Sequence, residues 1–472
     1  MIGRTKELEE LSNLYLSKKA ELVAVYGRRR VGKTYLINQT FKNKFFFKHA
    51  GLFLDNDEKN KTKIQLEHFA NSLSLYGIKI EKEIKTWFDA FFNLEKYIMS
   101  CLDTSKKVIF IDELPWLDTK GSNFISAFEG FWNNFACARD DLLVIVCGSA
   151  TSWMENRLIN NTGGLYGRVS YEIKLNPFNL KETKEFLEEN LVNYSLYDIT
   201  QTYMIFGGIP YYLNYIDKKY SLSQNIDNLF FKDNALLLLE FDRLFNSIFT
   251  FSDIAKSIIK LLSTNSIGFT RNEISKKLNI SDGGGLSKYL NSLIVSNFII
   301  KYIPFGFSKK EPHYKLIDPF CIFYIKFVLD KSGIDNLWSL DSTSSKISSW
   351  RGYAFENVCF NHIDQIKFAL GISNVSTNIS AFFNKEDSYQ IDLVIERKDN
   401  IINLCEIKFY SDEFKVNKDY YLKINRRTNL VKEKVSKKFS IMNTLISTYG
   451  IYKNEYYYSF TNSITLEDLF KI

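Results

Sequence analysis

The sequence predicts a multidomain α/β protein whose first domain is a parallel, helix-covered sheet built around a phosphate-binding loop. The first observation is the loop itself, G-x-x-x-x-G-K-T at residues 27–34, which follows an apolar run and precedes a helical pattern. The second is a later apolar run, Val108–Ile111, which ends in two acids. The third is the alternation of short apolar strands with amphipathic helices through residue 175, because strands separated by helices pair in parallel.

The spacing of the loop has a physical reason. Two glycines allow the tight turns that aim backbone N–H groups at a phosphate, and the helix that follows adds the positive end of its dipole. Lys33 supplies charge for the β- and γ-phosphates, and the Thr34 hydroxyl is placed to hold Mg²⁺. We therefore expect ATP and Mg²⁺ as cofactors. The nucleotide-binding residues predicted here are Gly27, Arg28, Arg29, Arg30, Val31, Gly32, Lys33 and Thr34.

The acid pair and one serine are predicted to complete the catalytic side of this site. Asp112 would hold Mg²⁺ through water, and Glu113 would orient and polarise the attacking water. A further strand, Leu142–Cys147, is followed by Ser149. That serine either senses the γ-phosphate or caps the helix that begins at Thr151.

For other positions of the first domain, the sequence leaves open whether the residue binds nucleotide or only supports the fold. Arg168, before the strand Tyr171–Leu175, would neutralise charge on the γ-phosphate in its own subunit or a neighbour's, or is an ordinary surface residue. At the start of the chain, Ile2, Gly3 and Arg4 would pack against the adenine, or only against the domain.

Composition limits the class of protein. The chain has 472 residues, enough for roughly three domains, with 45% hydrophobic and 24% charged residues, as in ordinary globular proteins. A net charge of +7 does not by itself indicate nucleic acid. Six cysteines form no CxxC pair, and four histidines suggest no zinc site. With no signal peptide and no apolar run of about 18 residues, we expect a cytoplasmic protein without a membrane partner.

The middle of the chain reads as helical. Helices through about residue 245, interrupted at Phe206–Pro210, suggest a lid over the nucleotide. Helices at 254–263, 270–278 and 286–296, the second with a Thr270–Glu273 capping box, precede strands at 298–302 and 313–316. This is the layout of a winged helix-turn-helix, which serves either DNA binding or plain packing and protein contact. If the domain binds DNA, the third helix would present the side chains of Ser287, Lys288 and Asn291 to the DNA.

A polar, serine-rich segment, 331–347, reads as a linker to a last domain that opens with a helix at 348–370. Two later strands carry Asp392 and the E-x-K of Glu406 and Lys408, and Glu356 lies on the preceding helix. E-x-K on a strand points both side chains to one face. Two carboxylates can hold Mg²⁺ while lysine orients or deprotonates water for attack on a phosphodiester; an edge salt bridge is the simpler alternative.

The segment after this motif is basic. Residues 415–438 contain nine Lys or Arg against two acids. A basic helix beside a metal site would suit a phosphate backbone, although a solvated helix face has the same composition.

Taken together, the motifs resemble the archaeal-type ATPase family, relatives of the signal-transduction and origin-recognition P-loop ATPases. The resemblance rests on I-G-R-x-x-E-L, G-R-R-R-V-G-K-T, F-I-D-E-L-P-W, C-G-S-A, G-R before L-N-P-F, G-G-I-P-Y-Y-L, Y-K-L-I-D-P-F and R-G-Y-A-F-E. The resemblance implies that the C-terminal domain is similar to those of the PD-(D/E)XK nuclease superfamily and has a restriction-endonuclease-like α/β fold. It also implies that Pro210 lies near the adenine.

The expected domains are therefore a P-loop ATPase core at 1–180, a helical lid at 181–248, a winged helix-turn-helix at 249–335 and a nuclease-like domain at 348–472. The leading hypothesis is an ATPase switch coupled to a DNA-directed, nuclease-like domain that cleaves phosphodiesters with a metal ion. The alternative is an ATP-regulated effector that binds DNA or protein through an inactive nuclease fold. A homo-oligomer is expected if Arg168 acts on a neighbouring subunit.

Overall fold

The structure is a computed structural model and describes residues 2–55, 58–249, 252–307, 312–329, 337–341, 344–384 and 389–472. The chain divides into two compact units, which are described separately below. The first comprises residues 1–177 and 244–252, and the second 178–243 and 253–472. Within these described ranges, no helix is long and apolar enough to cross a membrane.

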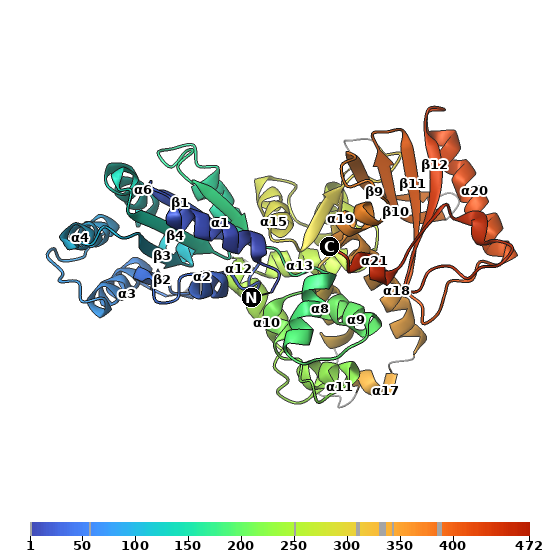
Figure 1. The fold of residues 1–472 in the computed structure, drawn as a ribbon, viewed down its shortest axis with the longest axis horizontal. Coiled ribbons are helices and arrows are strands. Elements are labelled where there is room, and N and C mark those ends of the chain that lie inside the picture. Colours follow the sequence, from blue (N-terminus) through green and yellow to red (C-terminus); the bar gives the residue numbers. More distant parts are fainter. Residues whose placement is uncertain are drawn as a thin grey trace. The chain divides into compact units, whose positions relative to one another are not determined.

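The first unit is built on a five-stranded parallel sheet (Figure 1). Its spatial order is β2-β3-β4-β1-β5, so β4 lies between the strand that precedes the phosphate loop and the strand that ends in the acid pair. Parallel strands end at one edge of the sheet, which places the loop and the acids together. The strands are β1 Glu21–Tyr26, β2 Phe45–Ala50, β3 Lys107–Asp112, β4 Leu142–Gly148 and β5 Tyr171–Lys174.

Helices cover this sheet and supply much of its core. Aromatic side chains of α3, α4 and α6 form one apolar cluster with the sheet strands. Neighbouring residues of α4 face different ways: Phe88 is 52% exposed, whereas Trp87 is fully buried. One residue turns the helix by about 100°, so the two cannot share a face. The helices are α1 Thr5–Leu16, α2 Lys33–Thr40, α3 Lys61–Leu75, α4 Trp87–Ser100, α5 Leu114–Leu117, α6 Phe124–Asn134 and α7 Thr151–Trp153, followed by a π-helical turn at Met154–Ile159.

The second unit begins with the helices predicted to form a lid. Their interruption follows from two adjacent glycines, Gly207 and Gly208, which both have positive φ. At Gly208 a Cβ would lie 2.1 Å from the Phe178 carbonyl oxygen, so only glycine fits this close approach. The helices are α8 Leu180–Glu189, α9 Leu196–Phe206, α10 Pro210–Leu213, α11 Leu222–Ile226 and α12 Glu240–Ile248, the last of which crosses between the units.

Three helices and a small antiparallel sheet follow. The predicted capping box of α14 is present, with the Thr270 hydroxyl accepting from the Glu273 N–H at 3.3 Å. The connection after β7 packs on the C-terminal sheet: Phe305 N–H donates to the Ala381 carbonyl at 2.9 Å. The elements are α13 Ser252–Leu262, α14 Arg271–Leu278, α15 Gly284–Val295, β6 Phe269–Thr270, β7 Ile299–Tyr302 and β8 His313–Leu316, with β8 in the centre of the sheet.

The segment predicted as a linker is packed where it is described. Trp338, on α17 (Leu337–Asp341), is buried, and its backbone N–H donates to the Asp227 carboxylate at 2.8 Å. Its ring contacts Trp350 of α18 (Ser345–Asn361). Residues 331–336 and 342–343 of the predicted linker lie outside the described residues.

The C-terminal sheet is mixed, in the order β13-β12-β11-β10-β9 (Figure 1). Strands β9, β10 and β11 pair antiparallel, while β11, β12 and β13 pair parallel. The helix predicted at 348–370 is broken at His362, whose Nε2 accepts the Leu180 N–H at 2.9 Å. The elements are β9 Thr377–Asn384, β10 Tyr389–Arg397, β11 Ile401–Lys408, β12 Ser440–Ser447, β13 Asn462–Ile464, α16 Pro319–Phe323, α19 Ile363–Ala369, α20 Lys418–Lys434 and α21 Leu466–Leu469.

Candidate functional sites

The phosphate loop joins β1 to α2 and depends on its two glycines. A Cβ at Gly27 would lie 2.3 Å from the Leu175 carbonyl oxygen, and Gly32, at the N-cap of α2, has φ +91°. The Lys33 ammonium folds back over the loop and donates to the carbonyls of Gly27 at 3.0 Å and Arg28 at 2.9 Å. These carbonyls hold the lysine where a phosphate can later replace them.

Two pairs of side chains converge beside the loop. The Thr34 hydroxyl donates to Asp112 at 2.7 Å, although the two residues are far apart in sequence. The Ser149 hydroxyl donates to Glu113 at 2.8 Å, and its backbone N–H donates to the same oxygen at 3.2 Å. Ser149 therefore contacts Glu113, the glutamate predicted to orient the attacking water. The N-cap of the following helix is Ala150, and no side chain caps that helix.

Burial raises the pKa of Glu113. The charge of Lys33 opposes this rise, and the charge of Asp112 adds to it. A carboxyl with a raised pKa is a better proton acceptor when ionised, as a general base requires. Hydroxyl and carboxylate oxygens are the donors that Mg²⁺ prefers, so the Thr34–Asp112 pair fits the metal expected with ATP.

The remaining predicted nucleotide residues are Gly3, Arg4, Arg168 and Pro210. Arg4 is buried and donates to the Asn176 carbonyl at 2.7 Å, which ties the start of α1 to the chain after β5; Gly3 precedes it with positive φ. Arg168 is exposed, and its N–H donates to the Leu165 carbonyl at 3.1 Å. Pro210 begins α10 in the second unit, so it stays a prediction for the adenine.

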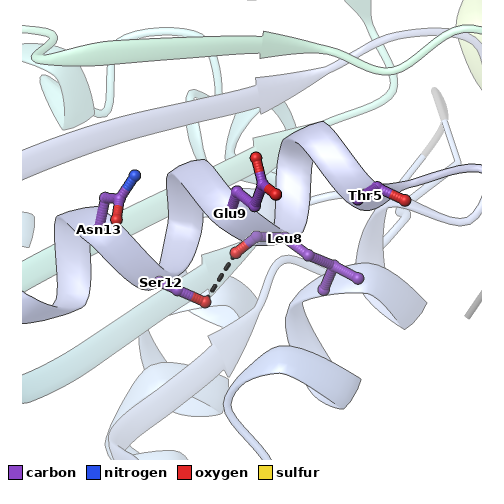
Figure 2. A pocket seen from close by; sticks show the side chains of 5 residues that line it. All are labelled: Thr5, Leu8, Glu9, Ser12 and Asn13. Carbon is purple, nitrogen blue, oxygen red and sulfur yellow. Dashed lines mark hydrogen bonds between the residues drawn. The ribbon is translucent and has the colours of Figure 1, made fainter.

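A shallow hollow of about 420 Å³ lies along α1 and contains no residue of the phosphate loop. Figure 2 shows its lining on successive turns of that helix, with the Ser12 hydroxyl donating to the Leu8 carbonyl at 2.7 Å. The hydroxyl is satisfied within the helix, and nothing here converges on a ligand. The lining residues are Thr5, Leu8, Glu9, Ser12 and Asn13.

A second charged site lies in the C-terminal sheet. Leu393 pairs with Cys405, which makes Asp392 and Glu406 the next opposing positions of β10 and β11. Asp392 accepts the Ile407 N–H at 3.1 Å, and the Lys408 ammonium lies 2.6 Å from Glu406. Asp392 thus lies beside the strand that carries the E-x-K motif.

Glu356 joins this site from α18. Burial raises its pKa to about 8, with a contribution from Asp392, and Lys315 and Lys408 oppose the rise. Burial likewise raises the pKa of Asp392 to about 6, with Glu406 contributing. Four predicted residues therefore share one electrostatic environment.

Sequence reasoning missed three residues of this site. Arg427 on α20 is buried and pairs with Glu406, which also accepts the Tyr420 hydroxyl. Burial alone would raise the pKa of Glu406, but Arg427 and Lys408 hold it at about 2. The composition of residues 415–438 indicates a basic helix that faces either a phosphate backbone or solvent. Only the period of α20 could have indicated that Arg427, beside Ile424 and Val431, turns inward.

Lys315 is the third missed residue and comes from β8. It is buried, with its ammonium 4.5 Å from the Phe360 ring centroid and 5.9 Å from that of Tyr353. Glu356 lies between those two rings on the same face of α18, since positions three and four residues apart are neighbours on a helix. Burial lowers the pKa of Lys315, and Glu356 and Asp392 oppose that shift. An isolated lysine in an apolar strand gives no such signal in sequence.

The second site does not fit a divalent metal ion as arranged. Both Glu406 oxygens are occupied, one by Lys408 and Tyr420 and the other by Arg427. Among the described residues, no group of three or more His, Cys, Asp and Glu is arranged to hold a metal. Lys408 and Arg427 already pair with the Glu406 carboxylate, so a metal ion would have to displace an ion pair.

Comparison with known proteins bears on the first site. Residues 1–216 match the profile of a family described as an ATPase domain predominantly from Archaea. An uncharacterized protein of Methanocaldococcus jannaschii is 25% identical over 435 residues, which cover 91% of this chain and 92% of that protein. An uncharacterized ATP-binding protein of the same organism is 46% identical over 52 residues, 11% of this chain and 86% of that protein.

A solved structure, the Walker-type ATPase of Pyrococcus abyssi, is 17% identical and covers 69% of this chain and 96% of that chain, with a TM-score of 0.49. The family match confirms the archaeal-type ATPase resemblance for the N-terminal part. The nuclease-like reading of the C-terminal sheet and the DNA-binding reading of α13–α15 stay predictions.

Proposed function

We propose that this chain is an ATP-hydrolysing switch whose second unit acts on DNA. Its first 216 residues resemble a family described as an ATPase domain predominantly from Archaea, and this likeness supports the ATPase part of the proposal. The observation that carries the proposal is the convergence on one sheet edge of Lys33, the Thr34–Asp112 pair and the Glu113–Ser149 pair. Each pair joins residues from different strands or loops, and an ordinary packing role would not require this set of charges and hydroxyls together.

Hydrolysis would use these groups in distinct roles. Loop N–H groups and Lys33 bind the β- and γ-phosphates, and Thr34 and Asp112 hold Mg²⁺, which neutralises phosphate charge. Glu113 orients a water in line with the γ-phosphorus and accepts its proton. Ser149 fixes the Glu113 carboxylate through the hydrogen bond of 2.8 Å.

The proposed role of the second unit rests on its surface. Lys288 and Asn291 are exposed on one face of α15, the helix that would read DNA in a winged helix. Ser287 is less available, because its hydroxyl accepts from Arg271 at 2.7 Å. Exposed lysines of α20 add positive charge, including Lys418, Lys423, Lys432 and Lys434.

The ATPase proposal is tested with Glu113→Gln. The variant should bind ATP like the parent chain but lose at least about 100-fold in turnover, because glutamine cannot accept the proton. Calorimetry measures binding and phosphate release measures turnover. Glu83→Gln, an exposed acid paired with Lys85, is the matched control and should leave both unchanged. If Glu113→Gln hydrolysed ATP as fast as the parent chain, a residue other than Glu113 would have to be the base.

The DNA proposal is tested by fluorescence anisotropy with duplex DNA at several salt concentrations. Lys288→Ala should weaken binding and reduce its salt dependence, since each phosphate contact releases a counterion. Affinity that does not depend on salt, or on Lys288, would favour the protein-contact alternative.

A second candidate, an effector with a nuclease fold that does not cleave, is favoured by the occupied carboxylate of Glu406. Incubation of the full chain with plasmid, single-stranded DNA and RNA in Mg²⁺ or Mn²⁺ separates the candidates. Cleavage that disappears in both Asp392→Ala and Lys408→Ala supports an active site; no cleavage supports the effector.

A further inference from the structure

The three consecutive arginines of the phosphate loop are in different environments. Arg28 is buried, and its carbonyl holds Lys33. Arg30 makes the turn, with φ +72°. Arg29 makes no side-chain hydrogen bond or ion pair with any residue in the described ranges, and its Nη1 is buried without a partner.

The position of Arg29 links it to the catalytic side of the loop. Its guanidinium carbon lies 5.9 Å from the ring centroid of Trp116. Trp116 is one turn after Glu113, and its N–H donates to the Glu113 carbonyl at 3.0 Å. The side chain of Arg29 is therefore beside the turn that begins at Glu113.

The Trp116 ring is itself held in place. It packs edge-to-face with Phe53 at 5.5 Å between centroids. A Cβ at Gly51 would lie 2.7 Å from the Glu113 carbonyl and 3.2 Å from the Trp116 Cβ, so the end of β2 closely supports this turn. The Trp116 ring is therefore held in position beside the Arg29 guanidinium.

A buried donor without a partner costs free energy, and such groups in folded proteins call for a ligand or an ion. Arg29 is also a cation without a carboxylate partner in the described chain, in a loop whose backbone is shaped for phosphate. A planar guanidinium donates to phosphate oxygens in a forked geometry. The chemistry that satisfies Arg29 is that of a polyphosphate.

We propose that Arg29 is a catalytic residue that contacts the γ-phosphate of ATP bound in its own subunit. The proposal rests on the ATPase function above. As the water oxygen bonds to the γ-phosphorus, its proton passes to Glu113, the bond to the β–γ bridging oxygen breaks, and that electron pair leaves with ADP. Arg29 donates to the γ-phosphoryl oxygens on which charge collects. The cation predicted at Arg168 is then not required from a neighbouring subunit.

The test compares Arg29→Ala with the parent full-length chain. Turnover should fall about 100-fold or more, as when a cation is removed from a phosphoryl-transfer site. Arg29→Lys should recover part of the loss, and added guanidinium chloride at millimolar concentration should raise the turnover of Arg29→Ala. Arg157→Ala removes an exposed charge that pairs with Asp118 in the same unit and should leave turnover unchanged.

A binding measurement separates this inference from the proposed function. In a Glu113→Gln background, Arg29→Ala should lower the affinity for ATP about tenfold and leave the affinity for ADP unchanged, because ADP lacks the γ-phosphate. Equal losses for both nucleotides, or unchanged turnover in Arg29→Ala, would overturn the inference. If the parent chain hydrolyses no ATP, the proposed function fails, and the ATP-to-ADP affinity ratio still decides whether Arg29 meets the γ-phosphate.

Discussion

The two charged sites of this chain differ in what satisfies their cations. At the phosphate loop, Lys33 is held by two backbone carbonyls, and Arg29 lies against an aromatic ring. In the C-terminal sheet, Lys408 and Arg427 both pair with the carboxylate of Glu406. The first site uses neutral partners and the second uses charged ones.

This difference indicates what each site can accept. A carbonyl is a weak competitor for a lysine when a phosphate arrives, so the first site can exchange its partners at low cost. A buried ion pair resists exchange, because removing one partner leaves a desolvated charge. The first site therefore has the properties of a ligand site, while the second has those of a structural ion cluster.

The largest expected effect tests the second site. Arg427→Met leaves the buried Glu406 carboxylate without its arginine and should destabilise the second unit by about 3–5 kcal/mol. Denaturant unfolding of the full chain, followed by circular dichroism, measures it. Lys432→Met, an exposed cation on the same helix, should change stability by no more than about 0.5 kcal/mol. Similar small effects for both would show that the cluster contributes little.

The next effect tests the first site. Lys33→Met keeps the length of the side chain but removes its charge, and ATP affinity should fall at least about 100-fold, or about 2.7 kcal/mol. The unfolding midpoint of the first unit should change little, since Lys33 loses two hydrogen bonds to carbonyls and an attraction to Glu113, but no direct ion pair with a described residue. A large loss of stability in Lys33→Met would mean that the two sites do not differ as argued.

A third prediction uses pH. Burial raises the pKa of Glu356 from 4.5 to about 8, so the folded chain binds a proton there that the unfolded chain has released. Stability from this group is present below about pH 4.5 and is lost as the pH rises through about 8. We expect Glu356→Gln to flatten the pH dependence of the free energy of unfolding between about pH 5 and 8, because glutamine does not titrate. Parallel curves for parent and variant would contradict it.

Sequence patterns could predict the groups that lie close to a motif. The loop, the acid pair and the E-x-K strand each encode their geometry in local spacing, and the structure brings Asp392 opposite Glu406. They could not predict Lys315, because its contact with α18 depends on how the sheet of β6–β8 packs, which no local period encodes. The same reason explains the buried Trp338 in a segment read as a linker.

The smallest expected effect concerns Ser149, whose two predicted alternatives lead to different measurements. Its hydroxyl donates to the ionised form of Glu113, and this hydrogen bond lowers the pKa that burial raises. Ser149→Ala keeps the backbone N–H and removes the hydroxyl, so the pKa of Glu113 should rise further. A base must be ionised to work, and the acid limb of kcat/KM should therefore move to higher pH, with turnover reduced about threefold near neutral pH. If Ser149 only supported the helix from Thr151, the variant would lower the unfolding midpoint and leave the acid limb in place.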